Sequence, residues 1–203
     1  MGAYYYLIAQ LPHLVYGQSA PMTAAAFKTL AGEHLSPAHR ALLDHCTLDA
    51  GLVLGEGGIA YSEDLEPTSS AFINRWRAWE RALRLHLARL RLQRLKGREA
   101  SADFVPPADP PEGFPDAALS AKAALAIESP LEAELFLDKS RWDLIEALMG
   151  FDNYFNVNTV FGYLLKLLLI GRWSAFKAEE GFAEYKGLYA SVMEAAPDRS
   201  PVG

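Results

Sequence analysis

Hydrophobic residues recur every three or four positions along most of the chain, and this is the period of amphipathic helices. The longest such stretch runs from Ala71 to Arg98, and its apolar row lies on one side of a helix: Phe72, Trp76, Trp79, Leu83, Leu87 and Leu90. A helix of this length measures about 40 Å at about 1.5 Å per residue. Since that exceeds the width of a small domain, we expect the helix to cross the molecule or to project from it.

Capping residues mark the starts of several shorter helices. Thr23 precedes one apolar period, and Ser36 followed by proline precedes another. The capping box that begins at Ser129 predicts a helix over Pro130–Met149, which Gly150 ends. We expect its inner face to carry Leu131, Leu135, Trp142, Ile145 and Leu148.

The last part of the chain predicts two more helices. Either Asn156 or Asn158 caps the first, which is apolar on most sides around Val160–Leu168 and should therefore be central. The second runs from Lys177 to Ala195.

Three segments interrupt the helical pattern. Residues 3–16 give both strand-like and helical signals, so a short N-terminal strand and a first helical turn stay open. Gly51–Glu66 is rich in glycine and acidic residues, which predicts a loop. Gly97–Pro115 contains five prolines and predicts a linker or long surface loop.

These elements together predict an all-α fold, a multi-helix bundle with one long basic amphipathic helix. The predicted organisation is an N-terminal helical region over residues 1–98, a Pro-rich linker over 99–116 and a C-terminal helical region over 117–196, all in one compact unit.

Charge is distributed unevenly over the 203 residues, whose formal net charge is -6. The segment Arg75–Arg98 holds nine of the 19 basic residues and one of the 25 acidic residues. A basic helix on an acidic body can bind an acidic partner, nucleic acid or a membrane surface. The candidate partner-binding residues lie at helical spacing: Arg77, Arg81, Arg84, Arg91 and Arg94. Alternatively, these arginines form a solvated face and pair with the protein's own acidic residues.

The sequence predicts no catalytic, cofactor or metal site. His34, His39, His45 and Cys46 lie close together, but their spacing matches no zinc motif. The Gly55–Gly58 run lacks the lysine of a phosphate-binding loop and is interpreted as a flexible turn. No nucleophile elbow is present.

Other sequence features predict a cytoplasmic protein. The single cysteine allows no internal disulfide and is typical of a reducing compartment. The N-terminus lacks the basic region of a signal peptide, and Lys166 interrupts the longest apolar run, which is too short for a membrane span.

The two ends of the chain resemble a known bacterial family. The N-terminal MGAYYYLIAQLPHLVYGQ, together with FLDKSRWDLIEALMG, FGYLLKLLLIGRW and EEGFAEYKGLY near the C-terminus, is similar to a family of unassigned function that is encoded beside V/A-type ATP synthase genes. The placement of Asp138, Trp142, Tyr163, Lys166 and Gly181 within long helices is in turn similar to the helical repeats of the V-type ATPase adaptor that joins the central stalk to the membrane ring, a longer protein of three helical domains.

This resemblance implies a non-catalytic helical component of an ion-translocating ATPase, a shortened counterpart of that adaptor. Its partners would be other ATPase subunits, and it would touch the membrane only through the complex, without nucleic acid, cofactor or small-molecule substrate. Two alternatives stay open: a regulatory or nucleic-acid-binding module that uses the basic helix, and an enzyme whose site is not recognised.

Overall fold

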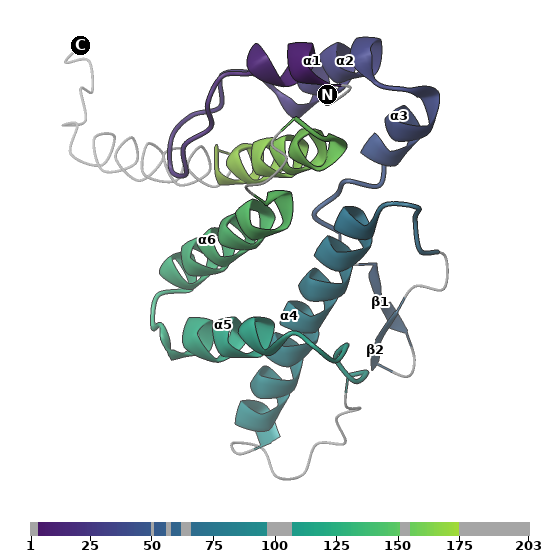
Figure 1. Cartoon of the computed structure of the whole chain (residues 1–203). Coiled ribbons are helices and arrows are strands. Elements are labelled where there is room, and N and C mark those ends of the chain that lie inside the picture. Colours follow the sequence, from purple (N-terminus) through teal and green to yellow (C-terminus); the bar gives the residue numbers. More distant parts are fainter. Residues whose placement is uncertain are drawn as a thin grey trace, which may run out of the picture.

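The structure is a computed structural model that describes residues 4–49, 51–55, 58–61, 66–96, 107–150 and 155–174. Most of these residues are helical, and the helices pack side by side and across one another (Figure 1). The labelled elements are α1 Tyr5–Ala9, α2 Ala24–His34, α3 Pro37–Leu43, β1 Leu52–Gly55, β2 Gly58–Tyr61, α4 Ala71–Lys96, α5 Pro115–Ala126 and α6 Pro130–Met149. A further helix extends over residues 157–174. The predicted all-α class is confirmed.

The long helix α4 crosses the molecule, as predicted. Its first turns bury Phe72, Ile73 and Trp76 in a hydrophobic core that α1, α2, α3 and the helix over residues 157–174 also supply. Its later turns bury Trp79 and Leu83 in a second core that it shares with α5 and α6. The helix is described as far as residue 96, so the predicted end at Arg98 lies outside the described residues.

The helix starts follow the predicted caps. The side-chain oxygens of Thr23, Ser36 and Ser129 accept backbone N–H groups in the first turns of α2, α3 and α6. Asn156, rather than Asn158, caps the next helix, because its Oδ1 accepts the N–H of Thr159 at 3.1 Å. These side chains satisfy donors that have no partner inside the helix.

The first described residues form the short helix α1 rather than a strand. Tyr4, Leu7 and Ile8 are buried, whereas Tyr5 and Tyr6 are 53% and 83% exposed. Burial at positions i, i+3 and i+4 is the pattern of a helix, whereas a strand buries alternate residues. The open alternative of an N-terminal strand is therefore excluded for the residues from Tyr4 onward.

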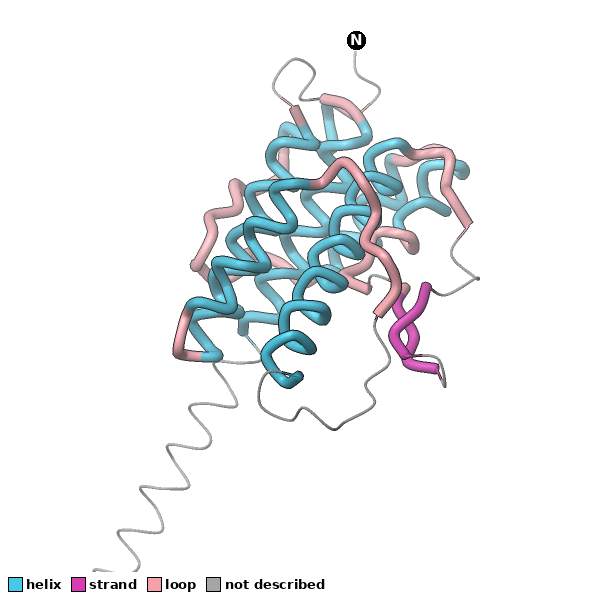
Figure 2. Tube along the Cα trace, turned by 90° about the horizontal axis from the view of Figure 1, so that it is seen from below, coloured by secondary structure: helices cyan, strands magenta, loops and turns pink. Residues whose placement is uncertain are grey.

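The prediction of a loop over Gly51–Glu66 is wrong in part. Strands β1 and β2 pair antiparallel with Leu52 opposite Tyr61 and Gly55 opposite Gly58, and the hairpin lies beside the helical body (Figure 2). The β-branched and aromatic residues on either side of a two-residue, glycine-containing connection are a hairpin signal. The glycine content of the segment obscured that signal.

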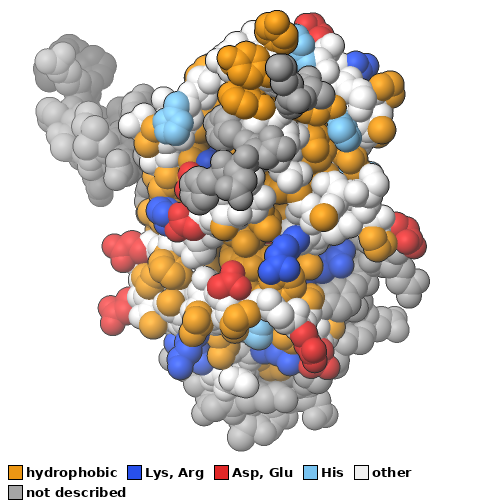
Figure 3. Space-filling view, viewed as in Figure 1, with side chains coloured by type: hydrophobic (Ala, Val, Ile, Leu, Met, Phe, Trp, Pro, Cys, Tyr) orange, Lys and Arg blue, Asp and Glu red, His pale blue; other side chains and the backbone are white. Residues whose placement is uncertain are grey.

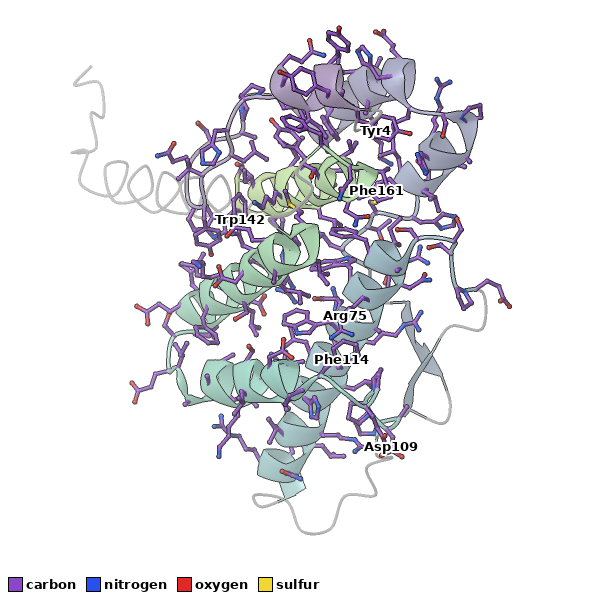
Figure 4. All side chains as sticks on the ribbon, in the orientation of Figure 1. Tyr4, Arg75, Asp109, Phe114, Trp142 and Phe161 are labelled. Carbon is purple, nitrogen blue, oxygen red and sulfur yellow. The ribbon has the colours of Figure 1, made fainter. Side chains whose placement is uncertain are left out.

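The described half of the Pro-rich segment is held against α4. Arg89 donates to the carbonyl of Pro107 at 3.3 Å and forms an ion pair with Asp109. The guanidinium of Arg75 lies 5.3 Å from the ring centroid of Phe114, and Figure 4 shows the two residues side by side. Residues 97–106 lie outside the described part of the chain.

Small residues let α5 pack closely on α4. Ala117, Ala121 and Ala124 are all buried against the second core. Because Ala side chains are short, the two helix backbones approach each other more closely than larger side chains would allow.

The helix over residues 157–174 is central, as its apolar pattern predicts. Phe161, Leu164 and Leu165 are fully buried, and Lys166 is 8% exposed. No described helix has the length and apolarity needed to cross a membrane. The predicted helix over Lys177–Ala195 lies outside the described residues.

Candidate functional site

The five arginines predicted to bind a partner lie in different surroundings along α4. Arg77 is 5% exposed, and its Nη2 donates to the carbonyl of His45 at 3.2 Å. The prediction that Arg77 lies on an accessible face is therefore wrong. Its burial, and the positive charge of the neighbouring Arg81, lower the pKa of the Arg77 guanidinium.

Arg81 and Arg84 are half-buried. Arg84 donates from Nε to Glu80 at 2.8 Å and from Nη2 to the carbonyl of Leu48 at 2.8 Å. Arg84 therefore pairs with one of the protein's own acidic residues, which was the alternative to a partner-binding role.

Arg91 and Arg94 are exposed and lie at the C-terminal end of α4. Within the described part of the chain they form no hydrogen bond or ion pair. Both border a groove of about 240 Å³ that runs between α4 and the junction of α5 with α6. Its apolar lining includes Leu87, Leu125 and Ile127, and its opposite rim includes Glu128.

Charged side chains elsewhere are mixed in sign. On the face seen in Figure 3, basic and acidic side chains of the described residues alternate with broad apolar areas. The charge asymmetry in the sequence therefore does not produce a continuous basic patch on this face, as a nucleic-acid-binding surface would require.

A buried ion network joins α4 to α6. Arg141 of α6 donates from Nε and Nη2 to the two carboxylate oxygens of Glu80 on α4, both at 2.9 Å. Arg141 Nη1 also donates to Asp138 at 2.7 Å. Glu80, Asp138 and Arg141 are 1%, 2% and 4% exposed. Burial alone would lower the pKa of Arg141, but the two carboxylates outweigh it and raise this pKa.

The network extends to the helix over residues 157–174 through Arg172. Arg172 contacts Asp138 at 3.5 Å and Glu134 at 2.6 Å. Burial nevertheless raises the pKa of Asp138, against the opposing effect of Arg141 and Arg172. Salt bridges thus connect α4, α6 and this last described helix.

This network was not predicted, because only apolar residues were expected on the inner face of α6. The structure places Trp142 and Ile145 there, as predicted, but also Asp138 and Arg141, while Leu131 is 39% exposed. The i, i+3 spacing of the two charged residues on the same face as Trp142 was the signal that could have revealed them.

A second polar pair surrounds Lys166. Its Nζ donates to Glu146 at 3.0 Å and lies 4.6 Å from the ring centroid of Trp142, which projects from α6 toward the last described helix (Figure 4). A single charge in a helix that is otherwise apolar on most sides signals a buried ion pair. In the sequence, this charge stood out only as an interruption of an apolar run.

The histidines and the cysteine considered as metal ligands lie apart in their contacts. His39 bonds to the hydroxyl of Tyr4, His45 to Arg77, and Cys46 donates to the carbonyl of Leu42. Burial raises the pKa of the Cys46 thiol to about 12, so the thiolate that binds metals is disfavoured. The described residues contain no group of three His, Cys, Asp or Glu side chains that could hold a metal ion.

Comparison with known proteins gives one family match. Residues 119–194 match the family described as "Protein of unknown function (DUF2764)". No curated protein and no solved structure matches the chain. The matched segment includes Asp138, Arg141, Lys166 and Arg172 but none of α4, so the chain is similar to this family in the α6 half of the buried network.

Proposed function

We propose that this chain is a non-catalytic helical subunit or accessory protein of a V/A-type ATP synthase, an adaptor that joins the central stalk to the membrane ring. The choice of complex rests on the resemblance of the two ends of the chain. The proposal includes a contact surface at Arg91 and Arg94.

The observation that carries the contact surface is the state of these two arginines. They are exposed and have no polar partner within the described residues, and they border an apolar groove. Arginine is enriched at protein interfaces, where its guanidinium pairs with carboxylates in a bidentate geometry. An acidic surface with an apolar side chain between its carboxylates would match both parts.

The buried network supports the adaptor role because it fixes this surface relative to the rest of the chain. Arg91 lies 11 residues after Glu80 on one uninterrupted helix, about 16 Å along its axis. Glu80 is in turn held by Arg141 of α6. An adaptor that transmits force needs such rigid connections between its contact surfaces.

Charge reversal with co-purification tests the proposal. The full chain with Arg91→Glu and Arg94→Glu is expected to recover at least about tenfold less of the other ATPase subunits than the original chain, as expected for the loss of two interface ion pairs. The matched control is Lys122→Glu with Lys139→Glu, which makes the same charge change on exposed positions of α5 and α6.

The outcomes separate the two parts of the proposal. If the original chain recovers no ATPase subunit from cells that express the complex, the ATPase assignment is wrong. If the original chain and both variants recover the subunits equally, the contact surface is wrong.

A further inference from the structure

A second hollow lies at the other end of the molecule from the arginine groove. A cavity of about 310 Å³ opens between α1, the loop that follows it, the C-terminal end of α6 and the helix over residues 157–174. These elements converge in the upper part of Figure 1. Ile8, Leu14 and Met149 form much of its apolar wall, and Glu146 and Lys166 form its charged wall.

The ammonium of Lys166 has spare hydrogen-bonding capacity. It carries three N–H donors. One donates to Glu146, and the ring of Trp142 occupies a second direction. The ammonium has no further polar partner within the described residues, although Lys166 is only 8% exposed. A buried donor of this kind gains free energy when an acceptor reaches it.

Glu146 supplies a complementary acceptor. Its Oε1 accepts from both Lys166 Nζ and Trp142 Nε1, at 3.0 Å and 2.9 Å, which leaves Oε2 free of these two donors. Burial would raise the pKa of this carboxyl, but the hydrogen bond and charge of Lys166 and the bond from Trp142 outweigh it and lower the pKa. Glu146 is therefore ionised at neutral pH.

The charged wall therefore presents one positive donor and one negative acceptor next to each other. A simple anion would meet the ammonium but would also lie beside the Glu146 carboxylate, and a simple cation would meet the reverse arrangement. A head group with both charges is attracted to both side chains.

We propose that this cavity binds a small zwitterion with an apolar tail, of the aliphatic α-amino acid class. The ligand carboxylate accepts from Lys166, the ligand ammonium donates to Glu146 Oε2, and the aliphatic tail packs against Ile8, Leu14 and Met149. The volume of about 310 Å³ is at the small end of the range of ligand pockets, about 300–1,000 Å³, and suits a single small molecule. This binding site is independent of the proposed ATPase association.

Ligand titration of the full chain tests the site, with L-leucine as the probe. Two comparison compounds keep its branched tail and one charge each: 4-methylpentanoate has the carboxylate, and isopentylamine has the ammonium. We expect both to bind at least about tenfold more weakly than L-leucine, because each loses one charge-assisted hydrogen bond.

Two variants test the two charged residues. Lys166→Met keeps the length of the side chain, and Glu146→Gln keeps its shape, and each is expected to weaken L-leucine binding at least about tenfold. The matched control is Lys139→Met, which removes a lysine from an exposed i, i+4 ion pair with Asp143 on α6 and should leave binding unchanged. Far-UV circular dichroism shows whether each variant is folded.

Three results would overturn the proposal: no measurable L-leucine binding, equal binding of 4-methylpentanoate or isopentylamine, or unchanged L-leucine binding in the folded Glu146→Gln variant. The last variant decides the question if Lys166→Met does not fold, because Glu146 is half-exposed and its replacement is isosteric.

Discussion

Replacement of Arg141 by methionine tests whether the buried network sets the stability of the fold. The change removes three charge-assisted hydrogen bonds, two to Glu80 and one to Asp138. It also leaves two buried carboxylates with fewer partners. Breaking a buried ion pair by removing one member typically costs about 3–5 kcal/mol.

The remaining contacts place this variant at the lower end of that range. Arg84 still donates to Glu80 at 2.8 Å, and Arg172 still lies 3.5 Å from Asp138. We therefore expect Arg141→Met to lower the free energy of unfolding by about 3 kcal/mol. For a chain of this size that corresponds to a decrease in Tm of roughly 6–12 °C.

Urea unfolding followed by circular dichroism measures the change. Lys139→Met serves as the control, because its ion pair with Asp143 is about half exposed on both sides and should contribute less than about 1 kcal/mol. If the unpaired charge is the cause, adding Glu80→Gln to Arg141→Met should recover part of the loss. A loss no larger than that of Lys139→Met, or no recovery in the double variant, would refute the reasoning.

Four further predictions concern single positions. The folded Cys46 thiol, with its pKa raised to about 12, keeps a proton that the unfolded thiol loses above about pH 9, so the free energy of unfolding should fall as pH rises through this window, by up to about 1.4 kcal/mol per pH unit. Urea titrations at about pH 8 and about pH 10 should show a smaller fall for Cys46→Ala, and an equal fall would contradict the assignment. Ala121→Leu should cost about 1–3 kcal/mol by overpacking the α4–α5 contact, measured by urea unfolding, and a neutral result would mean that the contact is loosely packed. Gly150→Ala should cost about 1–3 kcal/mol because φ is +70° and ψ is 169° at this residue, and an unchanged Tm would count against that conformation. Ser129→Ala should cost about 1 kcal/mol in the same unfolding assay through loss of the α6 cap, and Ser129→Asp should restore most of it.

Much of the helical framework could be predicted because its signals are local. The apolar period of α4, the caps at Thr23, Ser36 and Ser129, and the glycine after α6 each act within a few residues of the chain. The all-α class follows from these signals, since they leave few stretches for a sheet.

The hairpin and the first helix show where local signals compete. The same glycines that favour a loop also permit the tight connection between β1 and β2. The aromatic run at Tyr4–Tyr6 favours a strand by propensity, but burial of Leu7 and Ile8 on one face selected a helix. Tertiary packing overrode propensity at both places.

The candidate site depended on tertiary structure still more. At the sequence level the arginines of α4 differ little, since each occupies a helical position in the same basic segment. Packing alone buried Arg77, paired Arg84 and left Arg91 and Arg94 at the surface. The sequence by itself determined that α4 is a long basic helix. Only the tertiary structure decided which charges face a partner and which are buried, because the carboxylate that holds Arg141 lies 61 residues away along the chain.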